Sequence, residues 1–150
     1  MKRTFIYFIC IILLVCMLAI PASATGIDQQ IISQNVIYIS DDYYYIETIT
    51  IPAVQPYGST KTGTKTSVCV SSGTSIFTLT VTGTFTYDGS SSTATKATGS
   101  ISTHVASATV NDRYAYTSGS SACAFASVSY NGATLQKTVT LTCDKNGNLS

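Results

Sequence analysis

Charged residues are scarce in this sequence of 150 residues. Asp, Glu, Lys and Arg make up only 10% of it, and eight basic residues stand against seven acidic ones. The chain also has no tryptophan, three prolines and a single histidine. Nucleic acids and anionic membrane surfaces attract proteins through basic patches. Because the charges are few and balanced, we expect no nucleic-acid partner.

The single histidine, His104, limits the catalytic chemistry that the chain can offer. A hydrolytic triad needs a base beside an activated nucleophile and a third group that orients the base. Serines are numerous, but no nucleophile-elbow sequence contains one, and the acids are scattered along the chain. We interpret His104 as a surface or cross-strand residue, and we expect no catalytic residues and no enzyme activity.

Metal and cofactor sites are not indicated either. A zinc site needs three or four ligands, and His104 and the cysteines lack the CxxC or HxxxH spacing of such sites. Residues 144–148, DKNGN, resemble the start of a calcium loop without its later glutamate, and we predict an Asn-Gly turn there. Glycosidase chemistry needs two facing carboxylates. The acids are Asp28, Asp41, Asp42, Glu47, Asp88, Asp112 and Asp144, and most of them adjoin Gly, Asn or another Asp in predicted turns. We therefore expect no metal-binding residue, no cofactor-binding residue and no cofactor.

Long apolar runs are confined to the N-terminus. Lys2 and Arg3 precede an apolar run over residues 5–20, and Pro21 and Ala-Ser-Ala follow it. A charged start, a short apolar centre and a small-x-small end are typical of a secretory signal peptide. An uncleaved anchor is the alternative, but the run is shorter than the roughly 20 residues that span a bilayer. We predict a signal peptide over residues 1–24, a secreted extracellular protein, and no stable membrane insertion after cleavage.

Period-2 alternation dominates residues 76–87, IFTLTVTGTFTY. Apolar residues alternate with threonines, which predicts a β-strand with one apolar and one hydroxyl face. Gly83 falls on the apolar side, where it indicates a bend, a bulge or a gap filled by another side chain. With the hairpin described next, this strand supplies the predicted core: Phe77, Leu79, Val81, Phe85, Val128, Val139 and Leu141.

Asn131-Gly132 between two alternating runs predicts a two-residue hairpin, because both residues tolerate the positive φ of a type I′ turn. The resulting register places nearly every apolar residue on one face, with Lys137 as the exception. It also sets Cys123 opposite Thr140 and Cys143 about three residues, or roughly 10 Å, further along, on the other face. A disulfide between these two cysteines is therefore excluded, since it tolerates at most about 7 Å between Cα atoms.

Cys69 is the third cysteine outside the predicted signal peptide. An odd number allows at most one internal disulfide, which would have to include Cys69. The simpler expectation is that all three cysteines remain small, partly buried thiols.

The N-terminal part is harder to interpret. Residues 25–40 fit either a short helix or an extended chain, and residues 43–51 fit a strand or an extended arm. The tyrosines at 43–45 are compatible with a carbohydrate-stacking site, although strand propensity explains them more simply. Residues 52–66 contain two prolines, glycines and repeated Thr and Lys, and they predict a linker or long loop. We therefore expect an extension of uncertain order at 25–56 and a domain at 57–150.

The predicted domain consists of short strands separated by turns, with no convincing long helix. A change of apolar phase within residues 101–110 suggests a bulge near Val105. Short alternating strands with regular turns are typical of an all-β fold. We predict a single antiparallel β-sandwich of about seven strands, preceded by the signal peptide and the N-terminal extension.

The patterns TVTGTFTYDGSSSTAT and, at the end, KTVTLTCDKNGNLS resemble small uncharacterised secreted proteins of Gram-positive bacteria, which share a GTFTY-G strand and a C-terminal VTLTC-x-x-G pattern. The resemblance covers the C-terminal two-thirds and implies export and a compact β-domain, without an activity or a substrate. We hypothesise a secreted, non-catalytic protein that binds or is displayed at the cell envelope or outside the cell. The alternative is a small bacteriocin-like or toxin-like effector.

Overall fold

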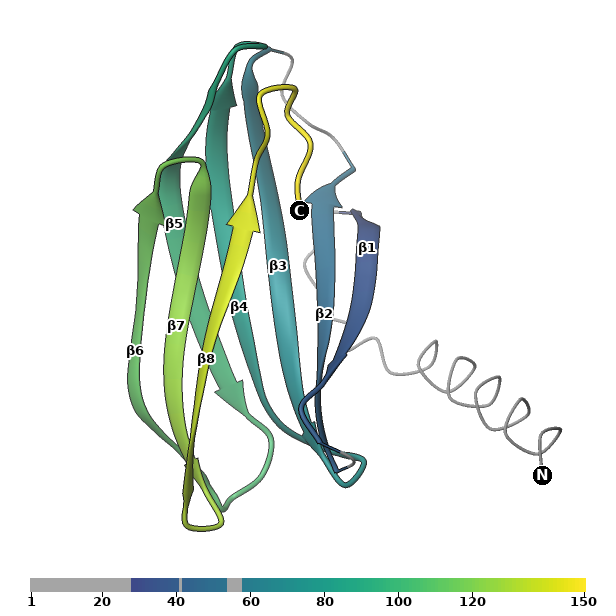
Figure 1. Ribbon diagram of the computed structural model, residues 1–150, viewed down its shortest axis with the longest axis vertical. Helices are drawn as coiled ribbons and strands as arrows, with labels where there is room; N and C mark the ends of the chain where they lie inside the picture. The colour runs from purple at the N-terminus through teal and green to yellow at the C-terminus, as the bar shows by residue number, and fades with distance from the viewer. Residues whose placement is uncertain (1–27, 41, 54–57) are drawn as a thin grey trace, which may run out of the picture.

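The computed structural model describes residues 28–40, 42–53 and 58–150, and all the regular structure in these ranges is β-strand (Figure 1). The strands are β1 (Gln29–Tyr38), β2 (Tyr43–Pro52), β3 (Thr60–Ser71), β4 (Thr74–Tyr87), β5 (Ser92–Thr103), β6 (Ala108–Ser118), β7 (Ser121–Tyr130) and β8 (Ala133–Thr142). The all-β prediction is confirmed, with eight strands rather than about seven. The predicted signal peptide lies outside the described residues.

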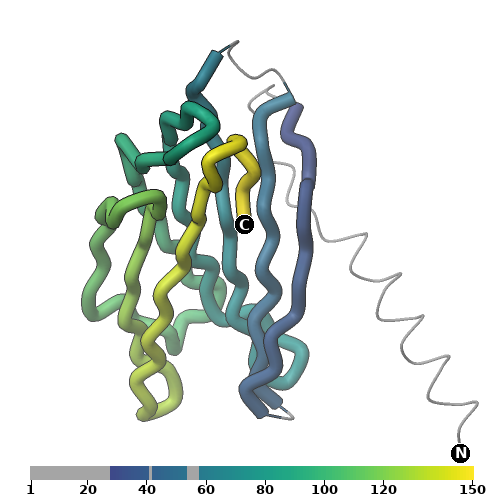
Figure 2. The backbone as a smooth tube through the Cα atoms, turned by 45° about the horizontal axis from the view of Figure 1, so that its top comes forward, coloured from purple at the N-terminus to yellow at the C-terminus, as the bar shows by residue number. Residues whose placement is uncertain are grey.

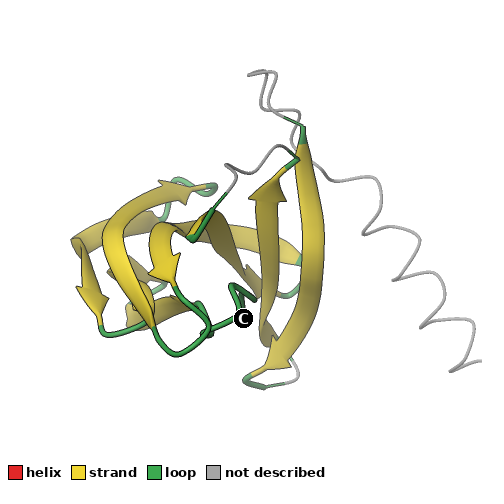
Figure 3. Cartoon of the chain, turned by 90° about the horizontal axis from the view of Figure 1, so that it is seen from above, coloured by secondary structure: helices red, strands yellow, loops and turns green. Residues whose placement is uncertain are grey.

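The strands form two antiparallel sheets. β1 to β5 lie in sequence order in the larger sheet, and β6 to β8 lie in sequence order in the smaller one. The smaller sheet packs against β3, β4 and β5, whereas β1 packs extensively on β2 alone. The larger sheet therefore extends past the smaller one on the side of β1 and β2, as the view from above in Figure 3 shows.

The core lies between the inner faces of the two sheets, with β4 at its centre. The seven predicted core residues are all at most 1% exposed: Phe77, Leu79, Val81, Phe85, Val128, Val139 and Leu141. This part of the prediction is confirmed. Gly83 is the gap in the apolar face, because a Cβ atom there would lie 2.6 Å from Cζ of Phe85 and 2.7 Å from Cβ of Ala122. The absence of a side chain thus lets the ring of Phe85 pack over the backbone.

The β7–β8 hairpin has the predicted register. Asn131 and Gly132 form the turn with φ values of 49° and 78°, and Ala126 pairs with Lys137. The strand pairing is continuous over all ten residues of each strand. Local turn chemistry and apolar alternation specify this hairpin together.

The cysteines also follow the prediction. Cys123 pairs with Thr140, and the N–H of Cys143 donates to the carbonyl oxygen of Ser120 at 3.0 Å. Cys69, Cys123 and Cys143 are all buried and free. Burial raises the pKa of the Cys69 and Cys143 thiols, so both groups stay in the unreactive thiol form at neutral pH.

The linker prediction for residues 52–66 is wrong from Thr60 onward, because β3 begins there and pairs with β2 and β4. Gly63 is needed inside β3 because a Cβ atom would collide with the side chain of Leu149. The C-terminal segment, yellow in Figure 2, lies against β3 at this point. Residues 29–38 and 43–52 of the N-terminal extension form β1 and β2, so they continue the same sheet. The predicted boundary near residue 57 lies outside the described residues.

The bulge prediction near Val105 is also wrong. β5 ends at Thr103 and β6 begins at Ala108, so residues 104–107 form the connection between the two sheets. The apolar phase changes there because the chain passes from one layer to the other. Register shifts lie elsewhere: in β1–β2 near Ile32, in β3–β4 near Cys69, in β4–β5 near Phe85 and in β6–β7 near Asn111.

Candidate functional site

The three adjacent tyrosines at 43–45 point to different sides of the larger sheet, as consecutive strand residues must. Tyr45 is buried and meets the ring of Phe77 edge-on, with ring centroids 6.5 Å apart. Tyr44 lies 5.7 Å from the ring of Tyr38, and Tyr43 packs on the core. These rings do not form a shared stacking platform, so strand packing explains the triplet.

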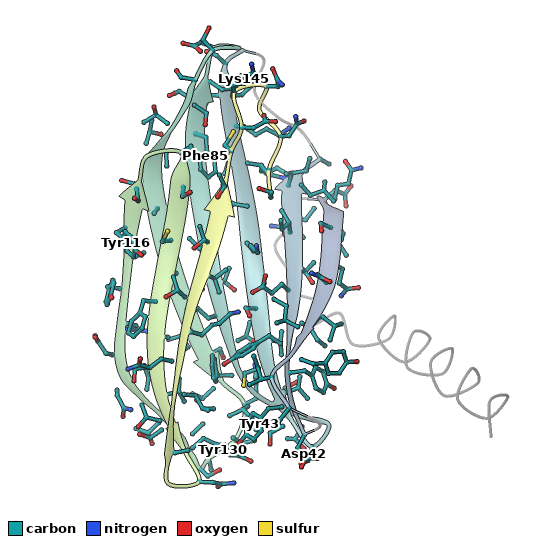
Figure 4. All side chains as sticks on the ribbon, viewed as in Figure 1. Asp42, Tyr43, Phe85, Tyr116, Tyr130 and Lys145 are labelled. Atoms are coloured by element: carbon teal, nitrogen blue, oxygen red, sulfur yellow. The ribbon has the colours of Figure 1, made fainter. Side chains whose placement is uncertain are left out.

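An exposed group of aromatic rings lies instead on the outer face of the smaller sheet. Tyr114 and Tyr116 of β6 are 52% and 44% exposed. The Tyr114 ring stacks on Phe125 of β7 with centroids 4.9 Å apart, and it lies 5.9 Å from the ring of Tyr116. We call these three residues the aromatic surface; Figure 4 labels Tyr116 at the side of the molecule.

The alternation of β6 explains how the tyrosines come to face outward. Ala115, between them, points inward, since a Cβ atom on Gly99 of β5 would lie only 3.2 Å from the Ala115 Cβ atom. Alanine and glycine at this contact allow β5 and β6 to approach closely, and the larger residues on either side of Ala115 are left outside. The sequence pattern that marks this surface is Tyr-Ala-Tyr, in which two bulky residues flank a small one. The pattern alone does not show which face of β6 packs against the other sheet.

Uncharged hydrogen-bonding groups border the aromatic surface. Phe125 pairs with Thr138 and Cys123 pairs with Thr140 on β8, and the Cys123 sulfur lies 3.7 Å from the Thr140 hydroxyl. The Cys123 thiol is also the main cause that raises the pKa of Tyr116. The surface therefore combines apolar rings with hydroxyl groups, and it is held on a rigid three-stranded sheet.

A groove of about 320 Å³ lies between β5 and β6 and adjoins the aromatic surface. Its lining includes Gly99, Ser100, Ile101, Arg113, Tyr114 and Phe125. A second depression of about 490 Å³ lies at the β6 bulge and shares Arg113 with the groove. Because Tyr114 and Phe125 belong to both the groove and the aromatic surface, a ligand stacked on these rings can extend into the groove.

The outer face of the larger sheet has a different character. Hydroxyl groups of opposed threonines on β3 and β4 share hydrogen bonds: Thr62 with Thr84 at 3.3 Å, Thr64 with Thr82 at 3.0 Å and Thr66 with Thr80 at 3.2 Å. Such cross-strand pairs stabilise the sheet itself. His104 lies exposed at the end of this face, and its Nε2 atom is 2.7 Å from the Thr78 hydroxyl. It occupies the kind of surface position beside a neighbouring strand that the sequence indicated.

Lys137, the exception to the apolar face of the hairpin, forms an ionic link between the sheets. Its Nζ atom lies 2.8 Å from Oε1 of Glu47 on β2 and 4.3 Å from the ring centroid of Tyr45. Lys65 of β3 approaches the other Glu47 oxygen at 3.4 Å. All three ionic side chains are largely buried, with 13–18% of their surface exposed.

The charges of this cluster determine its protonation. Burial alone would raise the pKa of Glu47, but the hydrogen bond and charge of Lys137, together with Lys65, lower that pKa below its ordinary value. The pKa of Tyr45 is raised, mainly by burial and then by Cys69. Glu47 is therefore ionised and Tyr45 neutral at physiological pH, and the cluster joins two sheets rather than presenting a reactive group.

Asp144 is occupied within its own turn. Its Oδ1 atom accepts hydrogen bonds from the backbone N–H groups of Asn146 and Asn148, both at 2.8 Å. The side-chain amide of Asn148, which donates to Oδ2 of Asp144 at 2.8 Å, and then these backbone bonds lower the pKa of Asp144. The predicted Asn-Gly turn is confirmed. Among the described residues, no group of three or more His, Cys, Asp or Glu side chains is arranged to hold a metal ion.

Comparison of the chain with protein-family models, curated proteins and solved structures finds no match. In the described part of the chain, there is no helix with the length and apolar character needed to cross a membrane.

Proposed function

We propose that this protein is a secreted, non-catalytic β-sandwich that binds a carbohydrate component of the cell envelope or of the extracellular surroundings. The observation that carries the proposal is the aromatic surface of Tyr114, Tyr116 and Phe125. Large aromatic side chains seldom remain clustered and exposed without a partner. The expected export supports a ligand outside the cell.

The chemistry around the rings favours sugar over a purely apolar partner. One face of a pyranose ring carries C–H groups that pack on aromatic rings, while its edge carries hydroxyl groups. Thr138 and Thr140, which pair with Phe125 and Cys123, supply hydroxyl groups of the matching kind. Pockets that recognise small ligands combine apolar surface with a few placed polar groups in the same way.

The test is a titration of the purified protein with soluble peptidoglycan fragments and with neutral oligosaccharides, followed by tyrosine fluorescence and calorimetry. We expect Tyr114→Ala and Tyr116→Ala each to weaken binding about tenfold or more, since truncating a central aromatic anchor removes roughly 2 kcal/mol. Ile39→Ala is the matched control, because it removes an exposed large apolar side chain that lies outside β1 and on the other sheet's side of the molecule.

Equal binding by the Tyr114 and Ile39 variants would refute the carbohydrate proposal. Growth inhibition of neighbouring bacteria by the purified protein would instead support the effector role. The export step has its own readout: mass spectrometry of the culture medium is expected to find a mature N-terminus at Thr25, and full-length protein in the membrane fraction would contradict it.

A further inference from the structure

In the described part of the chain, strand β1 is an edge strand of the larger sheet, with no strand beyond it. All ten of its residues are exposed, and it packs extensively on β2 alone. Five of them are large apolar residues: Ile31, Ile32, Val36, Ile37 and Tyr38. The edge of a sheet presents unpaired N–H and C=O groups that another strand can bond. β1 therefore offers both hydrogen-bonding groups and apolar surface to a partner.

The usual protections of an edge strand are largely missing from β1. It has no charged residue and no proline, and it is ten residues long. Its one irregularity, a bulge between Ile31 and Ser33 in the pairing with β2, leaves residues 33–38 regular. The opposite edge is guarded, because β5 carries Lys96 and packs against β6. Proteins block unwanted edge pairing with charges, prolines or covering elements, so the difference between the edges indicates that pairing at β1 is used.

We propose that β1 pairs with β1 of a second copy of this chain, in antiparallel register, to form a two-fold dimer with a continuous ten-stranded sheet. The sequence of β1 reads the same by residue class in both directions around Gln34: Ile-Ile-Ser-Gln-Asn-Val-Ile over residues 31–37. A two-fold axis at Gln34 therefore sets Ile31 and Ile32 of one copy beside Val36 and Ile37 of the other. Polar residues meet polar residues at the centre.

A second copy fits this edge better than a charged strand from another protein. Because β1 carries no charge, two copies bring no like charges together, whereas a charged partner would bury its charge against apolar side chains. The pairing also closes on itself, because β5, the second edge strand of each larger sheet, carries Lys96 and packs against β6, and both features disfavour the addition of a further strand. The expected product is a dimer and not a fibre.

Gln34 is the position that tests the proposal most directly. It is exposed and at the two-fold axis, so its replacement does not disturb the core. In the dimer the two Gln34 side chains face each other at about 5 Å, a distance at which like charges destabilise a strand pair. Gln34→Lys and Gln34→Glu are each expected to raise the dimer dissociation constant about tenfold or more in sedimentation experiments.

An equimolar mixture of the two variants restores dimerisation if copies meet at Gln34, because Lys then faces Glu. Gln136→Lys, which adds the same charge at an exposed position of β8, is the control and is expected to dimerise as the unaltered protein does. Hydrogen exchange provides an independent readout, since the backbone amides of β1 are expected to slow as concentration rises. A monomer at every concentration, or a dimer unaffected by either Gln34 variant, overturns the proposal. Occupation of β1 by a different protein would overturn it equally.

Discussion

The ionic link between the sheets leads to a quantitative prediction about Glu47→Gln. This change keeps the shape of the side chain but leaves Lys137 and Lys65 without their counter-charge. Exposed ion pairs contribute about 0–1 kcal/mol, and removing one partner of a fully buried pair costs about 3–5 kcal/mol. With 13–18% of each side chain exposed, the cluster lies between these limits. We expect Glu47→Gln to lower the free energy of unfolding by about 1–3 kcal/mol.

The two lysines are expected to differ. Lys137 lies 2.8 Å from Glu47 and also over the Tyr45 ring, while Lys65 lies 3.4 Å from Glu47. Urea unfolding of Glu47→Gln, Lys137→Met and the double variant gives the coupling energy of the closer pair, for which about 1–2 kcal/mol is expected. The same cycle with Lys65→Met serves as the internal control, and we expect it to give a smaller coupling energy.

The contribution of Glu47 depends on pH with a definite sign. Because its pKa is lowered in the folded state, the stabilisation is fully present above the ordinary glutamate pKa of about 4.3 and is lost as the pH falls through the folded value. The stability difference between the unaltered protein and Glu47→Gln should therefore shrink below about pH 4.3. A coupling energy below about 0.5 kcal/mol at pH 7, or a difference that does not shrink in acid, would refute the reasoning.

Two further predictions concern the core and the thiols. Leu79→Ala should lower the free energy of unfolding by roughly 2–5 kcal/mol, because it removes a fully buried side chain; a loss below about half a kcal/mol in urea unfolding would mean that the inner face of β4 is exposed. Cys69, Cys123 and Cys143 should resist a thiol reagent in the folded protein and react after unfolding, because all three are buried. Non-reducing peptide mapping should recover no Cys123–Cys143 linked peptide, and finding one would contradict the hairpin register.

Parts of the fold that depend on neighbours in sequence could be predicted. The β7–β8 register follows from Asn131-Gly132 and the alternation on either side, and the central strand follows from its own period-2 pattern. By contrast, residues 60–66 look like a linker because glycine, lysine and threonine dominate them. They form a strand because β4 pairs with them and Leu149 packs over Gly63, and neither contact can be seen in the local sequence.

The candidate site was missed for a related physical reason. In β6, alanine and tyrosine alternate, and hydrophobicity alone favours placing the tyrosines inside. Ala115 instead packs closely on Gly99 of β5, and the tyrosines are therefore left on the outer face. This contact joins two different strands, so the alternation within β6 cannot reveal it. The change of apolar phase near Val105 is visible in the sequence. A bulge within one strand and a loop that connects two sheets both change the phase in this way, so the sequence alone does not distinguish them.

The strand order of the two sheets has a consequence for how the chain reaches its folded state. Since each strand bonds to the one before it within its sheet, a chain that emerges from its N-terminus can pair each new strand as it appears, without waiting for distant segments. The core cannot be completed in this way, because the apolar face of β4 is covered by β7 and β8, the last strands to emerge. Until then the five-stranded sheet exposes its inner face, and this interval is when the molecule is most open to aggregation and to proteases.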